Sequence, residues 1–166
     1  MGVDSHFSLC RSLWELPLAN RKVQVVKLHG RALIPTFAHP TDSGMDLSSA
    51  EKLVLKRGQR RLVRTGLAVR FPKLTEGQIR PRSGLALKYG VTVLNAPGTI
   101  DEGYSGEISV LLINLGASDF TVKTGMKIAQ LVVSPRIDVR ISEVKSFRSK
   151  KRSTRGSRGF GSTGMM

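Results

Sequence analysis

The chain has 166 residues, enough for one domain with a sizeable core and too few to expect two independent ones. Its formal charge of +15 favours polyanionic partners such as nucleic acid, anionic lipid or a phosphorylated small molecule. The single cysteine, Cys10, excludes an internal disulfide, and no apolar run is long enough to span a bilayer. We therefore expect a soluble, cytoplasmic protein that does not enter a membrane.

Short apolar runs separated by glycine and proline predict an all-β fold. Residues 1–20 lack a regular pattern and are expected to form an N-terminal extension. Strands are expected at 22–28, 51–55, 61–71, 78–80, 91–94, 107–114, 120–122 and 128–133, with turns at 56–58, 96–98 and 123–125. One short helix is expected from Gly84 to Tyr89. So many short strands favour a sandwich or jelly roll of two packed sheets.

The last segment, residues 145–166, consists mainly of Ser, Gly, Lys and Arg, and no acidic residue follows Glu143. It has too few apolar side chains to order itself. We expect a β domain over residues 21–144 followed by a flexible, basic, glycine-rich arm. The run Lys150-Lys151-Arg152 is either a solvated linker or a contact for nucleic acid.

The segment Arg80-Pro81-Arg82-Ser83-Gly84 places two guanidinium groups and a hydroxyl at the start of the expected helix. Unpaired N–H groups at a helix N-terminus and nearby arginines both attract phosphate. The same residues would also suit an ordinary solvated turn. The segment is a candidate phosphate site.

A second candidate lies between Leu94 and Glu107, where a loop carries Asn95, Asp101, Glu102 and Tyr104. Asp101 directly follows Ile100, so a carboxylate stands at the edge of an apolar element, where it could orient a water molecule. The alternatives are an ordinary turn aspartate and a tyrosine used only for packing.

The tail offers a third candidate in Gly159-Phe160-Gly161-Ser162-Thr163-Gly164. Its glycines permit close backbone approach to phosphate, and the phenylalanine ring could stack on a base. Arg155 precedes it and favours an anion. A flexible tail or an RNA-binding segment would show the same composition.

Taken in chain order, five segments resemble the five motifs of the trimeric dUTPase family. They are residues 43–47 (SGMDL), 80–86 (RPRSGLA), 98–107 (GTIDEGYSGE), 125–130 (GMKIAQ) and 155–164 (RGSRGFGSTG). The second, third and fifth are specific, whereas the first and fourth are weak alone. The resemblance implies a jelly-roll subunit, a homotrimer with shared active sites, and a C-terminal arm that closes over a neighbour's site.

The resemblance also implies Mg²⁺-assisted hydrolysis of dUTP to dUMP and pyrophosphate, which keeps dUTP low and supplies dUMP for dTMP synthesis. Asp101 matches the aspartate that orients the attacking water. Tyr104 matches the residue that packs beneath the deoxyribose, and Asp46 the residue that meets the metal through water. The other implied substrate contacts are Arg82, Ser83, Gly84, Asn95, Thr99, Ile100, Gln130, Arg155, Phe160, Gly161, Ser162 and Thr163.

The chain departs from the family pattern at Arg158, where glycine is usual, and at Met45, where the residue type varies. Two other functions stay open from the sequence. A dCTP deaminase would share the fold, although the family's aspartate and tyrosine at Asp101 and Tyr104 favour hydrolysis. A binding module would keep nucleotide recognition and use its basic arm for nucleic acid.

Overall fold

The computed structural model describes residues 22–146, so the predicted N-terminal extension and most of the predicted arm lie outside the described residues. Within this range the chain forms ten strands and one helix. The strands are β1 (Gln24–Lys27), β2 (Gly44–Ser48), β3 (Leu53–Leu55), β4 (Arg60–Arg70), β5 (Thr75–Arg80), β6 (Val91–Val93), β7 (Gly98–Ile100), β8 (Glu107–Asn114), β9 (Phe120–Val122) and β10 (Lys127–Pro135). The helix α1 (Ser83–Tyr89) is seven residues long, and no described helix is long and apolar enough to cross a membrane. The all-β prediction is confirmed.

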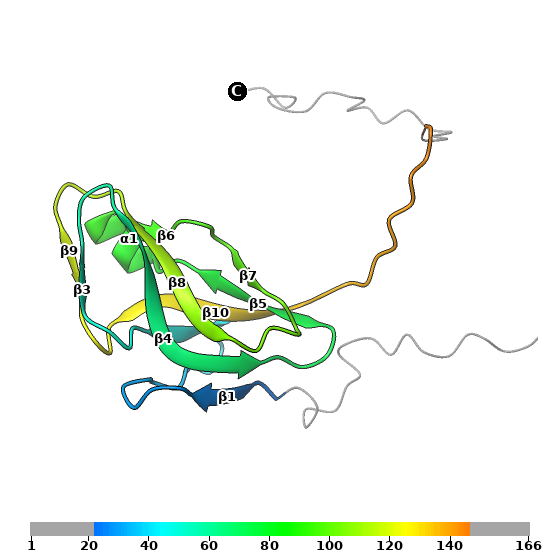
Figure 1. The fold of residues 1–166 in the computed structure, drawn as a ribbon, viewed down its shortest axis with the longest axis horizontal. Coiled ribbons are helices and arrows are strands. Elements are labelled where there is room, and N and C mark those ends of the chain that lie inside the picture. The colour runs from blue at the N-terminus through cyan, green and yellow to red at the C-terminus, as the bar shows by residue number, and fades with distance from the viewer. Residues whose placement is uncertain (1–21, 147–166) are drawn as a thin grey trace, which may run out of the picture.

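Two four-stranded sheets make up most of the fold (Figure 1). One has the order β1-β4-β8-β6 and the other β2-β10-β5-β7, while β3 and β9 form a separate pair. Every pair of neighbouring strands is antiparallel. In the second sheet, β5 lies between β10 and β7 and pairs with both.

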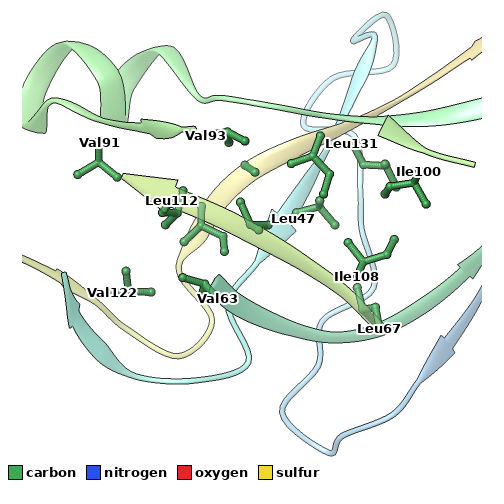
Figure 2. Close-up of a cluster of buried hydrophobic side chains, with 14 of the residues drawn as sticks. Leu47, Val63, Leu67, Val91, Val93, Ile100, Ile108, Leu112, Val122 and Leu131 are labelled. Atoms are coloured by element: carbon green, nitrogen blue, oxygen red, sulfur yellow. The ribbon is translucent and has the colours of Figure 1, made fainter. Parts of the chain in front are cut away.

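The core lies between the two larger sheets (Figure 2). Strand β8 shows how it is built: Ile108, Val110 and Leu112 are buried, and the residues between them are only partly buried. This alternation follows from the period of two along a strand. Leu47 and Leu131 of the other sheet are fully buried against the same core. Burying each leucine or isoleucine contributes roughly 1.5–3 kcal/mol.

The positions of the predicted strands agree with the structure, but two strands were not predicted. The first is β2, whose five residues include Gly44 and Asp46. The second is β7, whose first residue, Gly98, was assigned to the turn at 96–98. That turn ends one residue earlier, with a cis peptide bond between Ala96 and Pro97.

The chain after β10 leaves the sheets in an extended conformation (Figure 1). In this segment, residues 136–146, Ile137, Val139 and Ile141 are 81%, 77% and 97% exposed. They alternate with Asp138, Arg140 and Ser142 in sequence. Alternating apolar and polar residues are typical of a strand with one buried face. No other part of the described chain buries the apolar face of this segment.

Candidate active site

A pocket of about 400 Å³ is lined by residues of β2, β10 and the junction between β5 and α1. We call it the phosphate pocket, because most of its polar groups suit an anion. Its cationic side chains are Arg80, Arg82 and Lys127, and its carboxylates are Asp42 and Asp46. Three positive charges against two negative ones leave the lining with an excess of one positive charge.

Strand pairing places three polar residues in one row across this pocket. Gln130 of β10 is the register partner of Asp46 on β2 and of Arg80 on β5. Directly paired residues of antiparallel strands point to the same face of the sheet. The next residue, Leu131, is fully buried on the opposite face. The row therefore faces the pocket.

The carboxylate of Asp46 is held by two cations. Arg82 Nη1 donates to its Oδ1, and Lys127 Nζ lies 2.7 Å from its Oδ2. Gln130 is fixed beside them, because its Nε2 donates to the carbonyl of Pro81 at 2.9 Å. Gly44 makes room for this side chain: a Cβ at Gly44 would lie 2.5 Å from Gln130 Oε1. The Arg82 and Gln130 side chains are thus oriented before any ligand binds.

Ser83 and Gly84 supply main-chain donors at the same pocket. They form the first turn of α1, whose N–H groups have no intrahelical partner. Arg82 is the N-cap residue and makes no side-chain capping bond. A Cβ at Gly84 would meet nothing within 4 Å, so its backbone is open to a ligand. These N–H groups are suited to phosphate oxygens.

A second pocket, of about 180 Å³, is lined by the loop and strand around β7. We call it the nucleoside pocket. It includes Asn95, Thr99, Ile100, Asp101 and Tyr104, all predicted from the sequence. The Asn95 amide lies against β7, where a Cβ at Gly98 would be 3.3 Å from its Nδ2. A small pocket with an amide, a carboxylate and a ring can recognise a base and a sugar.

The turn from Asp101 to Tyr104 shapes this pocket. Tyr104 N–H donates to the carbonyl of Asp101 at 3.0 Å, and Tyr104 Oη donates to the carbonyl of Glu107 at 3.0 Å. The ring lies over Gly106, where a Cβ would be 2.5 Å from Oη. Asp101 is exposed and forms no ion pair within residues 22–146. Its carboxylate is therefore free to bind water.

Glu107, also in the nucleoside pocket, is held differently. Its Oε1 accepts the Gly66 N–H at 2.8 Å, and its Oε2 accepts Arg64 Nε at 3.0 Å. Partial burial raises the pKa of Glu107, but the hydrogen bonds from Arg64 and Gly66 outweigh burial and hold the pKa below its ordinary value. Glu107 is thus an ionised structural residue at the pocket wall.

The nucleoside pocket runs along β5 from Ile79, beside Arg80, to Gly77, and Asp101 lies at its end farther from the phosphate pocket. Ile100, next to Asp101, pairs with Gly77, whereas Arg82 and Ser83 follow Arg80 at the other end. At roughly 3.3 Å per residue, about 10 Å of strand separates Gly77 from Arg80. A catalytic base must be within about 3 Å of its water. In Figure 1, α1 and the loop after β7 accordingly lie at different ends of the sheet.

The structure thus divides the predicted residues into two groups. Asp46, Arg82, Ser83, Gly84 and Gln130 line the phosphate pocket. The residues predicted from the loop around β7 line the nucleoside pocket. The remaining predicted residues, Arg155, Phe160, Gly161, Ser162 and Thr163, lie outside the described residues.

Four charged residues of the pockets were not selected from the sequence as site residues: Asp42, Arg80, Glu107 and Lys127. Asp42 directly precedes the first quoted motif. Lys127 and Glu107 belong to quoted motifs, but neither was given a role. Arg80 was noted only as one of two neighbouring guanidinium groups. The register of β10 with β2 and β5 is the signal that assigns Arg80 and Lys127 to the pocket, and it depends on β2, which was not predicted.

The chain is similar to known proteins of one family. A family model described as dUTPase matches residues 31–164. The deoxyuridine 5′-triphosphate nucleotidohydrolase of Clostridium novyi (strain NT) is 54% identical over 144 residues, covering 87% of this chain and 99% of the relative. That of Gloeothece citriformis (strain PCC 7424) is also 54% identical over 144 residues, covering 87% and 97%.

Solved structures give the same result. The dUTPase of Staphylococcus bacteriophage 80alpha with dUpNHpp has a TM-score of 0.79 and 29% identity, covering 86% of this chain and 98% of that one. A variant of the dUTPase from phage phi11 of S. aureus has a TM-score of 0.72 and 27% identity, covering 77% and 99%. The latter structure describes the coordination of a structural Mg(II) ion.

Proposed function

The chain belongs to the dUTPase family, and from this membership we infer that it hydrolyses dUTP to dUMP and pyrophosphate. The observation that carries the inference is the presence of both kinds of site that the reaction needs. The phosphate pocket offers cations and free N–H groups, and the nucleoside pocket offers an unpaired carboxylate beside an amide and a ring. The reaction keeps dUTP low and supplies dUMP for dTMP synthesis.

Asp101 is assigned as the residue that orients the attacking water. The water oxygen forms a bond to the α phosphorus as the bond from that phosphorus to the bridging oxygen breaks. Pyrophosphate leaves, and the proton of the water passes to the Asp101 carboxylate. The exposure of Asp101 and its lack of an ion pair in the described chain support this role.

Sugar and base selection are assigned to the nucleoside pocket. The Tyr104 ring, fixed over Gly106, supports the deoxyribose and leaves no room for a 2′-hydroxyl. Asn95, with the backbone of Thr99 and Ile100, reads the edge of uracil. A pocket that pairs its polar groups with one base rejects bases that leave those groups unpaired.

Phosphate binding is assigned to the phosphate pocket. Ser83 meets the oxygen that bridges the α and β phosphates, while Arg82 and Gln130 hold phosphate oxygens. The fixed positions of Arg82 and Gln130 support this assignment. Groups oriented in advance stabilise developing charge without reorganising.

The active site is proposed to form between copies of the chain in a homotrimer. Two observations support this: Asp101 is separated along β5 from Arg82 and Ser83, and segment 136–146 exposes an apolar face. The phosphate pocket of one copy then faces the nucleoside pocket of another. The arm residues Arg155, Phe160, Gly161, Ser162 and Thr163 would complete the site over a neighbour's nucleotide.

Mg²⁺ is proposed as the cofactor, and the residues fit a metal carried mainly by the substrate. Within residues 22–146, no three His, Cys, Asp or Glu side chains are grouped to hold a metal. Asp46 already contacts Arg82 and Lys127, so it would meet the metal through water. When bound, Mg²⁺ spreads the negative charge of the triphosphate. Oxygen ligands from phosphate and water are those that Mg²⁺ prefers.

A cytoplasmic location is proposed, since a single cysteine needs no oxidising compartment. Nucleic-acid binding through the basic tail stays a prediction. The contacts of that tail lie outside the described residues.

The test is pyrophosphate release from dUTP, dTTP, dCTP and UTP, measured in parallel with Mg²⁺ and with excess chelator. We expect release from dUTP alone, lost on chelation. Pyrophosphate release from UTP would contradict the proposal that Tyr104 excludes a 2′-hydroxyl. Release that persists with excess chelator would contradict the proposal that Mg²⁺ is the cofactor. No release from dUTP, or ammonia release from dCTP instead, would overturn the proposed function.

A further inference from the structure

The turn that carries Asp101 is tied to two distant segments through the next residue, Glu102. Glu102 Oε2 accepts the Leu74 N–H at 2.9 Å and lies 3.2 Å from Arg136 Nη2. Leu74 belongs to the connection between β4 and β5, and Arg136 directly follows β10. One carboxylate oxygen therefore joins three parts of the chain.

Leu74 closes this arrangement into a ring of contacts. Its carbonyl accepts the backbone N–H of Arg136 at 2.9 Å, while its own N–H donates to Glu102. Leu74 has a φ of 59°, which is uncommon for a residue other than glycine. Contacts on both sides of its backbone hold it in this conformation, so the Glu102 contact is part of a defined structure.

Arg136 lies where the body of the protein ends and segment 136–146 begins. It forms ion pairs with Glu102 and with Asp138. Hydrogen bonding to Glu102, followed by that to Asp138, raises the pKa of Arg136 above its ordinary value, so the guanidinium stays charged. The same residue thus contacts the turn of Asp101 and the root of the segment that leads into the tail.

We propose that Glu102 and Arg136 are positioning residues for hydrolysis: their ion pair fixes the Asp101–Tyr104 turn to the root of the C-terminal segment. This inference rests on the proposed function, in which Asp101 orients the water. A displacement of about 1 Å in a catalytic group can lower the rate about 100-fold. Asp101, Gly103 and Tyr104 are exposed, and apart from the hydrogen bonds of Tyr104 to Asp101 and Glu107 the turn is held through Glu102.

If the Glu102–Arg136 ion pair had only a structural role, its loss would lower stability as much as turnover. Glu102 and Arg136 side chains are 31% and 39% exposed, and exposed ion pairs contribute little to the free energy of unfolding. Loss of the pair should therefore lower turnover much more than stability. The effect should fall more on kcat than on KM, because neither residue lines the phosphate pocket or the nucleoside pocket.

The experiment compares Glu102→Gln, Arg136→Gln and the double variant with the wild-type chain in dUTP hydrolysis. Glutamine at 102 keeps an oxygen for the Leu74 N–H and removes only the charge. We expect each single variant to lower kcat about tenfold, with KM within about threefold, and the double variant to be no worse than either. Arg136→Lys should recover part of the loss, because it restores the charge.

Asp138→Asn is the matched control, since it removes the other ion pair of Arg136 and leaves Glu102 in place. Its kcat should equal that of the wild type. Normal kcat in Glu102→Gln, additive losses in the double variant, or an equal loss in Asp138→Asn would overturn the inference. A parallel collapse of urea stability would also overturn it. An inactive wild type would instead refute the proposed function, and this inference with it.

Discussion

At the scale of single residues, Glu107 shows how the wall of the nucleoside pocket is fixed. It is the first residue of β8, its side chain is 19% exposed, and it accepts hydrogen bonds from Arg64 and from the Gly66 N–H. Gly66 has a φ of 69°, a conformation that favours glycine. The Glu107 carboxylate therefore holds the bend of β4 at Arg64 and Gly66 against β8, the strand that follows the Asp101–Tyr104 turn.

The lowered pKa of Glu107 predicts a specific dependence of stability on pH. Because the folded-state pKa lies below the unfolded value, the folded protein binds fewer protons, and this stabilisation is present above the unfolded pKa. It is lost as pH falls through the folded-state pKa. Glu107→Gln should thus lower the free energy of unfolding at pH 7 by about 1–2 kcal/mol. The difference from the wild type should shrink in acid.

Urea denaturation at pH 7 and in acid, at one protein concentration, measures this difference. Glu143→Gln is the control, because Glu143 is exposed and forms no ion pair within the described range. A deficit in Glu107→Gln that is equal at both pH values would show that the ionised carboxylate is not the source of stability.

Single site residues could be predicted from the sequence where they belong to a recognisable motif. Asp101, Tyr104 and Asn95 follow from the sequence and lie in one pocket. Glu107 ends the same motif, but its role needs Arg64, 43 positions earlier, beside it. Nothing in the sequence places these two side chains together, because their contact depends on the pairing of β4 with β8.

At the scale of elements, Asn114 joins the end of β8 to its surroundings. It is fully buried, and its Nδ2 donates to the carbonyls of Leu55 and Ser118, each at 2.9 Å. Its Oδ1 accepts the Gly116 N–H at 2.9 Å. All its side-chain bonds go to backbone, so it links β3 and the loop after β8 where no strand pairing is available.

Replacing Asn114 should destabilise the whole fold. Asn114→Ala leaves the Leu55 and Ser118 carbonyls and the Gly116 N–H without these partners and creates a small cavity, so we expect a loss of about 2–4 kcal/mol. The midpoint of urea unfolding measures it. Ser109→Ala on the same strand is the control, and its expected change is within about 0.5 kcal/mol. Similar losses in both variants would contradict a special role for Asn114.

At this scale, elements could be predicted where a short apolar run is bounded by polar or turn residues. The strand Glu107–Asn114 was predicted with its observed bounds, because its apolar run from Ile108 to Ile113 is interrupted only by Ser109. Strand β2 was missed because its polar residue, Asp46, faces the phosphate pocket instead of open solvent. Strand β7 has only three residues and adjoins a proline turn. Both missed strands carry site residues, so function accounts for part of their weak pattern.

At the scale of the whole molecule, the separation of the two pockets was not predictable from the chain. The residues of both pockets are near in sequence: Ser83 and Asp101 are 18 positions apart. Only the pairing of β5 with β7 reveals that Asp101, which follows Ile100, lies near Gly77 and away from Arg80 at the end of β5. Sequence patterns gave no strand order, and strand order decides whether neighbouring motifs meet within one chain.

A mixing experiment tests whether two copies share one active site. The Asp101→Asn chain lacks the group that orients water, and the Ser83→Ala chain lacks a phosphate contact. Each should be nearly inactive alone. If the chains are unfolded, mixed in equal amounts and refolded together, random trimers should place an intact Asp101 opposite an intact Ser83 in about a quarter of sites. The pyrophosphate released from dUTP by the mixture measures this fraction.

The control mixture combines wild-type chains with chains that carry both substitutions. Sites shared between copies again give about a quarter of full activity, whereas sites within one chain give about half. In the first mixture, sites within one chain give none, because every chain lacks one essential group. Equal recovery in both mixtures therefore identifies a shared site. Recovery only in the control would place the whole reaction in one chain, and β5 would then have to bend to bring Asp101 to Ser83.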